Sequence, residues 1–155
     1  MGQTGITYKE VKVINASDGA ITASTTYAPS ALNQIGFYRE CWCVIKTTDQ
    51  DLPGAGDAVD VFIQTTFDSG NNWVDVENIH FENGTAVANR DDNETGTWVA
   101  ALTGAMISTT ARETGDATID ADTKLDIGFG SGLRVKIVVA NAGNITCDFY
   151  VHLKP

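Results

Sequence analysis

The sequence predicts an all-β protein, folded as a single-domain antiparallel β-sandwich that is jelly-roll-like and has about eight strands. Three observations favour this fold class. Apolar and polar residues alternate in several runs, most clearly over residues 59–67 and 133–153. Clusters of Gly, Pro, Asn and Asp separate these runs by roughly 10–15 residues. With 155 residues, the chain suits one domain that can bury a core without a metal or a disulfide.

The N-terminal end lacks any alternation. Residues 1–6 contain two glycines and no apolar pattern. We therefore expect an N-terminal arm at residues 1–7 and a β-sandwich domain at residues 8–155. No leader peptide is apparent in the arm, and no apolar run approaches the roughly 20 residues that span a bilayer.

Two strands follow the arm. The first is predicted at residues 8–14, where valines alternate with charged residues. Residues 15–19 contain Asn, Asp and Gly and predict a turn. The second strand is predicted at residues 20–27, and Pro29 ends it.

Residues 37–45 predict a central strand. They are aromatic and β-branched, and their apolar side chains fall on both faces, so we expect both faces to be covered. A helix over residues 30–38 is the alternative for the start of this segment. A proline and two glycines then predict a loop at residues 49–58.

A β-hairpin is predicted at residues 58–81. Its first strand alternates over residues 59–67, and a cluster of Asp, Ser, Gly and Asn at residues 68–72 forms the turn. The second strand begins at Trp73. Its apolar residues change parity near residues 77–78, which predicts a β-bulge or a bend.

The next segments are less regular. Residues 89–96 are polar and predict a loop; a cation site there is the alternative, but the spacing of a calcium-binding loop is absent. A strand is predicted at residues 97–110. Residues 111–124 predict a loop, with a short strand at residues 117–121 as an alternative.

The clearest alternation closes the chain. Residues 133–139 and residues 145–153 each place apolar side chains at every second position, with a turn at residues 141–144 between them. This pattern predicts two strands, each with one buried face, that pair with each other as an antiparallel hairpin.

The charge of the chain argues against some classes of partner. It has 10 basic and 20 acidic residues, a net charge of −10 and a pI of about 4.4. A nucleic-acid binder needs clustered Lys and Arg, and an anionic membrane attracts the same residues. We therefore expect no nucleic acid and no membrane as partners, and read the acidity as a means of solubility.

The three cysteines are Cys41, Cys43 and Cys147. An odd number is not a disulfide framework. Cys41 and Cys43 share a strand face and are not expected to bond to each other. We expect buried free thiols, and a single bridge from Cys147 to either of the others stays open.

No catalytic group of residues is evident. The two histidines, His80 and His152, have no cysteine or acid near them at the spacing of metal ligands, and no nucleophile, phosphate-binding or zinc motif occurs. We expect no enzyme activity, no catalytic residue, no metal site and no cofactor.

The turn at residues 66–73 resembles the Asp-box, with the pattern Ser/Thr-x-Asp-x-Gly-x-Thr-Trp. Asp68, Gly70 and Trp73 match it, and Asn72 stands where Thr is usual. Asp can accept hydrogen bonds from turn amides, Gly permits positive φ, and Trp packs over the turn. Sialidases repeat this box on propeller blades, and one copy in this chain cannot make a propeller. We interpret the three residues as a turn lock.

The hairpin also resembles small head proteins of tailed bacteriophages, in which an alternating strand runs into an Asp-x-Gly-x-x-Trp-x-Asp-Val turn. The positions that carry this resemblance are residues 59–65, Asp68, Gly70, Trp73, Asp75 and Val76, and the end of the chain at residues 132–153 is similar as well. The resemblance implies a capsid decoration (head cement) protein. Such a protein is a homotrimer made in the host cytoplasm, and it binds the major capsid protein on the outer surface of the virion.

The resemblance also implies where a partner binds, because the N-terminal arm of such proteins often reaches a neighbouring subunit. The candidates for partner contact lie in the arm and in the loop after residue 49. They are Met1, Gly2, Gln3, Thr4, Gly5, Ile6, Leu52 and Pro53. The alternative function is a carbohydrate-binding module or a minor tail or fibre module, in which exposed aromatic rings stack on sugars. Its candidate residues are Trp42, Trp73, Trp98 and Tyr150.

Overall fold

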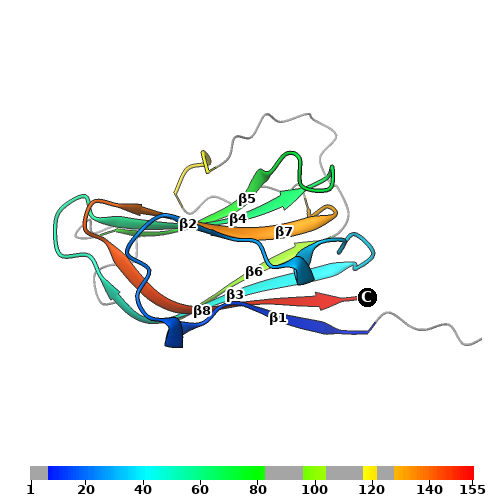
Figure 1. Cartoon of the computed structure of the whole chain (residues 1–155), viewed down its shortest axis with the longest axis horizontal. Coiled ribbons are helices and arrows are strands. Elements are labelled where there is room, and N and C mark those ends of the chain that lie inside the picture. The colour runs from blue at the N-terminus through cyan, green and yellow to red at the C-terminus, as the bar shows by residue number, and fades with distance from the viewer. Residues whose placement is uncertain (1–6, 83–95, 104–116, 122–127) are drawn as a thin grey trace, which may run out of the picture.

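A computed structural model describes residues 7–82, 96–103, 117–121 and 128–155, and for residues 96–103 it describes the backbone alone. Within these residues, eight strands form two four-stranded sheets that face each other (Figure 1). The first sheet has the order β1 (Lys9–Ile14), β8 (Asn144–Lys154), β3 (Glu40–Asp51) and β6 (Gly96–Thr103). The second has the order β2 (Thr25–Tyr27), β7 (Gly132–Ala140), β4 (Ala58–Thr66) and β5 (Val74–Glu82). The predicted all-β antiparallel sandwich is confirmed.

The strands pair in a nested order. β1 pairs with β8, β2 with β7, β3 with β6 and β4 with β5, and every pair is antiparallel. β8 also pairs with β3, and β7 with β4, which completes the two sheets. One long hairpin rolled into two layers produces this order, which is that of a jelly roll.

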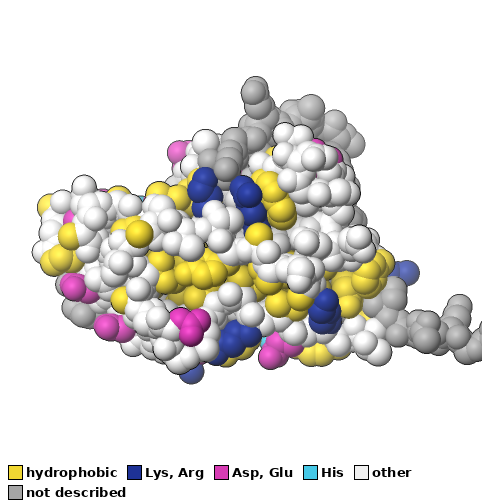
Figure 2. Space-filling model, in the orientation of Figure 1, with side chains coloured by type: hydrophobic (Ala, Val, Ile, Leu, Met, Phe, Trp, Pro, Cys, Tyr) yellow, Lys and Arg dark blue, Asp and Glu magenta, His cyan; other side chains and the backbone are white. Residues whose placement is uncertain are grey.

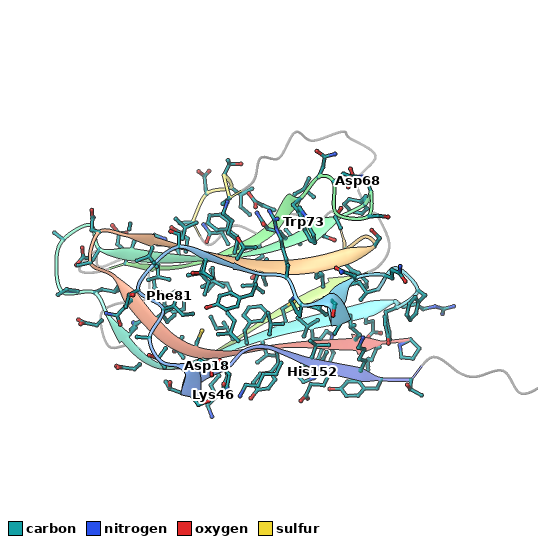
Figure 3. The ribbon with its side chains drawn as sticks, in the orientation of Figure 1. Asp18, Lys46, Asp68, Trp73, Phe81 and His152 are labelled. Atoms are coloured by element: carbon teal, nitrogen blue, oxygen red, sulfur yellow. The ribbon has the colours of Figure 1, made fainter. Side chains whose placement is uncertain are left out.

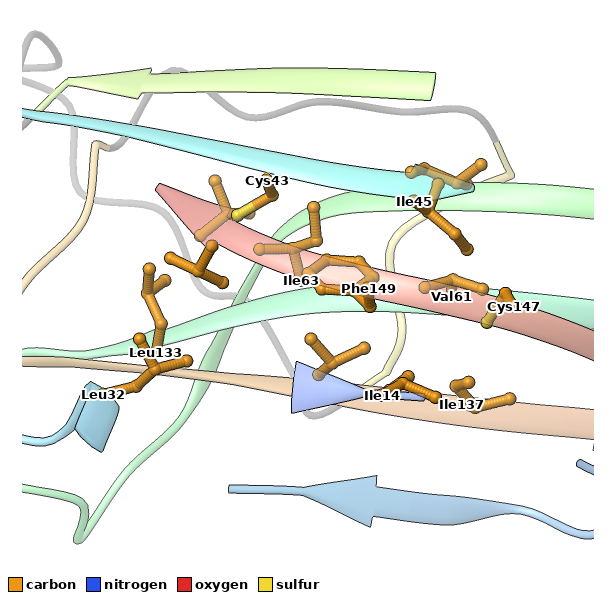
Figure 4. Close-up of a cluster of buried hydrophobic side chains, with 14 of the residues drawn as sticks. Ile14, Leu32, Cys43, Ile45, Val61, Ile63, Leu133, Ile137, Cys147 and Phe149 are labelled. Carbon is orange, nitrogen blue, oxygen red and sulfur yellow. The ribbon is translucent and has the colours of Figure 1, made fainter. Parts of the chain in front are cut away.

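The core lies between the two sheets (Figure 4). The alternating apolar residues of β8 and of β4 up to Ile63 face it, as the sequence predicts, because the period of a strand places every second side chain on one face. Phe67, which the alternation places on the same face, lies beyond the end of β4 and is 48% exposed. The buried members from these two strands are Val59, Val61, Ile63, Ile145, Cys147, Phe149, Val151 and Leu153.

The prediction that the last two strands pair with each other is wrong. β7 belongs to the second sheet and β8 to the first, so the turn at residues 141–143 carries the chain across the sandwich. Gly143 lies so close to β4 that a Cβ atom there would come within 2.9 Å of the Ala58 carbonyl oxygen. The two buried faces oppose each other across the core. Alternation encodes the buried face of a strand, not the strand that it pairs with.

The third predicted strand is also corrected. β3 runs from Glu40 to Asp51, so it begins later and ends later than predicted, and part of the predicted loop at residues 49–58 is strand. It is covered on one face only, since Trp42 on the other face is 46% exposed. In place of a helix over residues 30–38 there is a single 3-10 turn, η2 (Ser30–Leu32).

The predicted second strand is divided. Its first part forms a bridge to the first sheet, where Ile21 N donates to Ile145 O at 2.8 Å. Only its last three residues, β2, join the second sheet. The chain therefore changes sheets between residues 21 and 25. Before it, residues 16–18 form a second 3-10 turn, η1 (Ala16–Asp18). Neither of these short helices in the described residues could cross a membrane.

The predicted bulge in the hairpin is confirmed. Ile63 pairs with Glu77 and Gln64 with Asp75, so Val76 is the additional residue, next to the predicted position. The alternative of a short strand at residues 117–121 is wrong, because these residues form turns. The predicted loop at residues 89–96 and the strand continuation beyond residue 103 fall mostly outside the described residues.

Candidate functional site

The turn between β4 and β5 is held by the Asp68 side chain (Figure 3). Asp68 Oδ1 accepts hydrogen bonds from Thr66 Oγ1 at 2.8 Å and from the Asn72 backbone N at 2.9 Å. Asp68 Oδ2 accepts from Asn72 Nδ2 at 2.6 Å. The backbone and side-chain bonds from Asn72, followed by the bond from Thr66, lower the pKa of Asp68. Asn72, which departs from the Asp-box pattern, thus supplies two of the contacts to Asp68.

Gly70 and Trp73 complete this turn. Ser69 and Gly70 both have positive φ, 62° and 96°. The Gly70 backbone N donates to Thr66 Oγ1 at 2.9 Å, and the indole Nε1 of Trp73 donates to the Gly70 carbonyl oxygen at 3.2 Å. The polar groups of the turn are therefore engaged with one another. This geometry suits a turn that stabilises its own backbone.

A row of polar side chains runs from Trp73 across the outer face of the second sheet. The Arg134 guanidinium carbon lies 4.5 Å from the centre of the Trp73 ring, at the distance of a cation–π contact. Arg134 Nε donates to Gln64 Oε1 at 2.7 Å, and Gln64 Nε2 donates to Asp75 Oδ1 at 2.6 Å. Gln64 pairs with Arg134 on one side and Asp75 on the other, so the strand register brings the row together.

Asp75 ends this row and is 0% exposed. Besides Gln64, it accepts hydrogen bonds from three successive backbone amides: Ala117 N at 2.9 Å, Thr118 N at 2.7 Å and Ile119 N at 3.3 Å. A buried carboxylate requires such compensation. Asp75 therefore fastens residues 117–119 onto the outer face of the sheet. Sequence reasoning missed this anchor, although an aspartate inside an apolar strand was the available signal.

His80 lies between two carboxylates on the same face. Its Nδ1 is 2.7 Å from Asp60 Oδ1, and its Nε2 is 3.4 Å from Glu82 Oε2. Burial lowers the pKa of His80, but Asp60 and Glu82 together outweigh burial and raise it. Asn78 Nδ2 donates to the same Asp60 oxygen at 2.9 Å. In the part of the chain that the structure describes, no three His, Cys, Asp or Glu side chains are arranged to hold a metal ion.

The outer face of the first sheet carries aromatic rings. Trp42 pairs with His152 across β3 and β8, and Lys154 Nζ lies 5.2 Å from the centre of the Trp42 ring. The His152 Nδ1 atom contacts the hydroxyl of Tyr8, and the two rings stack at 5.9 Å. Tyr150, next along β8, lies 5.2 Å from the ammonium of Lys12. Trp42 and Tyr150 of the alternative carbohydrate-binding function thus share this face.

The side of the sandwich where β1 and β2 are edge strands is open. Apolar side chains show there as a band between the two sheets (Figure 2). A cavity of about 310 Å³ lies on this side, and its lining includes Val13, Ile21, Ala23 and Tyr27. We call this surface the open-edge groove. Its lining mixes partly buried apolar side chains with polar ones such as Asn15, Asp18 and Thr25. Within the described residues, β1 and β2 have no further strand at their outer edges, and such edges favour association.

The predicted partner-contact residues have different outcomes. Met1 to Ile6 lie outside the described residues. The prediction for Leu52 is wrong: its side chain is 0% exposed and belongs to the core, because it continues the alternation at the end of β3, where Gln50 is buried and Asp51 is exposed. Pro53, the next residue, is exposed. Trp98 lies in β6, where only the backbone is described.

All three cysteines are buried free thiols. Cys41 Sγ and Cys43 Sγ lie 3.8 Å apart on one face of β3. Burial raises the pKa of Cys147 to about 12, so this thiol stays protonated at neutral pH. The bridge that the sequence left open is not formed.

No family model matches the chain, and no curated protein matches it.

Proposed function

We propose that the protein is a virion structural protein that decorates the outer surface of a phage capsid and stabilises it by bridging major capsid protein subunits. The resemblance of the β4–β5 hairpin and of the chain end to phage head proteins motivates this proposal. The observation that carries it is the open-edge groove, because a protein that works by bridging needs a surface suited to association.

The groove offers two kinds of contact at once. The edges of β1 and β2 present backbone groups that can pair with a strand of another chain. The apolar side chains between the sheets, including Val13 and Tyr27, can be covered by that chain. The part of β1 that lines the groove is its C-terminal end, at Val13 and Ile14. We place the contacts with the capsid protein, or within a homotrimer, at the groove.

The jelly-roll fold supports this role through an analogy with other proteins of the same fold. Viral capsid and lectin domains use the same arrangement of strands, and one fold serves many functions. The net charge of −10 suits a protein on the outer surface of a shell, away from packaged nucleic acid.

The test uses the purified protein and shells assembled from the major capsid protein of the same virus, without decoration. We expect a trimer by mass photometry, or trimers formed on the shells, together with co-sedimentation and a higher melting temperature of the shells. A protein that stays monomeric and does not sediment with the shells would refute the proposal.

A matched pair of variants locates the contact. Ala23 is exposed and lines the groove, so Ala23→Arg places a charge there without removing a core contact. We expect shell binding to weaken by about tenfold or more, since an unpaired charge would be buried at the interface. Ala142→Arg adds the same charge at the exposed β7–β8 turn and should bind as the parent does. Equal binding by both variants would exclude the groove.

A further inference from the structure

A second cavity lies at the end of the sandwich beside the turn lock. It has a volume of about 380 Å³, within the range of small-ligand sites, which starts at about 300 Å³. Ser69 and Trp73 come from the β4–β5 turn, and Asn33 and Gln34 come from the segment after η2. Ser131, which directly precedes β7, also lines the cavity. Three segments that are distant in sequence thus converge on one concave surface.

The chemistry of this lining is neutral and polar. None of its side chains is charged. The side-chain amides of Asn33 and Gln34 are exposed and make no hydrogen bond within the described residues, so each offers two donors and an acceptor. Ser69 and Ser131 line the same cavity, where the Ser131 hydroxyl donates to the Thr66 carbonyl oxygen at 3.2 Å and accepts from Ser69 N at 3.3 Å. Amides and hydroxyls without a charge suit a ligand rich in hydroxyl groups.

Trp73 supplies an aromatic surface that is fixed before any ligand binds. Its Nε1 donates to the Gly70 carbonyl oxygen, and the Arg134 guanidinium lies 4.5 Å from its ring centre. At Gly70 and Gly132, a Cβ atom would lie 3.8 and 3.6 Å from the ring, so the glycines leave its edge uncrowded. An indole held in this way can stack on the apolar face of a sugar without loss of side-chain freedom on binding.

The backbone of the cavity is strained at two positions. Among the described residues, four other than glycine have positive φ, and two of these, Gln34 at 60° and Ser69 at 62°, line this cavity. Gln34 is held on both sides: Asn33 forms a bridge with Gly132, and Ile35 N donates to the Ser131 carbonyl oxygen at 2.8 Å. Strain that is held by neighbouring contacts gathers at ligand sites.

We propose that this cavity binds a neutral saccharide unit, with Trp73 as the stacking surface and the amides of Asn33 and Gln34 as the groups that recognise its hydroxyls. This site is distinct from the open-edge groove and goes beyond the proposed role in capsid decoration. Its test needs the protein alone and no shells, so the two proposals succeed or fail separately.

The experiment is an NMR titration of the full chain, labelled with nitrogen-15, with lactose, maltose, cellobiose and N,N′-diacetylchitobiose. We expect at least one of these sugars to shift the indole N–H of Trp73, the side-chain amides of Asn33 and Gln34, and the backbone N–H of Ser69. Saturating, dose-dependent shifts at these groups support the site. No shift with any of the four sugars overturns it, and shifts confined to the Trp42 face also overturn it.

Two variants sharpen the result. Gln34→Gly removes the amide and at the same time relieves the positive φ, so it should keep or raise the melting temperature. We expect it to weaken sugar binding about tenfold, the effect of one lost hydrogen bond of ordinary strength. Trp42→Ala alters the exposed face of the first sheet and should bind sugar as the parent does. Unchanged affinity in the Gln34 variant would refute the role of that amide.

Discussion

Replacing Asp75 by Asn tests the anchor on the outer face of the second sheet. The carboxylate accepts four hydrogen bonds, from Gln64 Nε2 and from the backbone amides of Ala117, Thr118 and Ile119. Asn keeps one acceptor oxygen and presents an NH₂ group to donors, so two of the four donors lose their acceptor. An unsatisfied buried donor costs about 1–3 kcal/mol; because the backbone amides of residues 117–119 are only part-buried, the free energy of unfolding should fall by about 1–3 kcal/mol in total. The free energy of unfolding of a typical domain is about 5–15 kcal/mol, so the variant should still fold.

Urea denaturation of parent and variant measures this loss, and hydrogen exchange reports on its location. The amides of residues 117–119 should lose protection in Asp75→Asn, while the core strand β4 keeps protection in proportion to global stability. Asp120→Asn is the matched control, since Asp120 is exposed beside the same segment and should change stability by no more than about 0.5 kcal/mol. A loss below about 1 kcal/mol with unchanged protection at residues 117–119 would contradict the reasoning.

Three further outcomes follow from ionisable groups. Asp68 has a lowered pKa, so its contribution to stability is present above about pH 3.9 and is lost as the pH falls through the pKa of the folded state. In urea denaturation at a series of acidic pH values, the free energy of unfolding of Asp68→Asn should therefore fall less steeply with pH than that of the parent. An equally steep fall in both proteins would disprove this. His80 has a raised pKa, so its contribution is full below about pH 6.5 and is lost as the pH rises through the folded value. His80→Gln should therefore lose more stability relative to the parent at about pH 5.5 than at about pH 8.5; an equal loss at both would argue against it. The buried thiols, including Cys147, should react with dithionitrobenzoate only in denaturant, and rapid reaction of the native protein would show that they are accessible.

Local patterns in the sequence were sufficient to predict part of the fold. Alternation correctly marked the buried face of β8, and the change of parity after Trp73 correctly marked the bulge at Val76. In β4 it marked Val59, Val61 and Ile63, but the opposite face is buried as well, so alternation there did not separate buried from exposed residues. The pairing of β7 with β8 was wrong because any two alternating strands joined by a short turn have the same pattern, whether the turn stays in one sheet or crosses between two. The prediction that both faces of the strand around Trp42 are covered was wrong for a related reason, since an apolar residue on an outer face looks like a core residue.

The candidate sites were harder to predict than the strands, because most of their contacts join residues that are far apart in the sequence. The turn at Asp68 is local, and its contacts lie within eight residues of sequence that the pattern already marked. The cavity beside it is not local, because Gln34 and Ser131 reach it from far along the chain. Likewise, the amides that bind Asp75 lie more than 40 residues away, and backbone amides carry no signal in the sequence. Leu52 was misplaced because a leucine beside Pro53 in a short loop can face either way.

The nested pairing of the strands has a consequence for how the chain folds. β8 is synthesised after the seven other described strands, yet it lies between β1 and β3, and Lys9 pairs with Leu153. Most pairings therefore close very long loops, and among the described strands only β4 and β5 are paired neighbours in sequence. High contact order slows folding, because the entropy of loop closure is lost before the contacts form. The hairpin can form early as a local nucleus, whereas the first sheet stays open, with β1 and β3 unjoined, until β8 has been made.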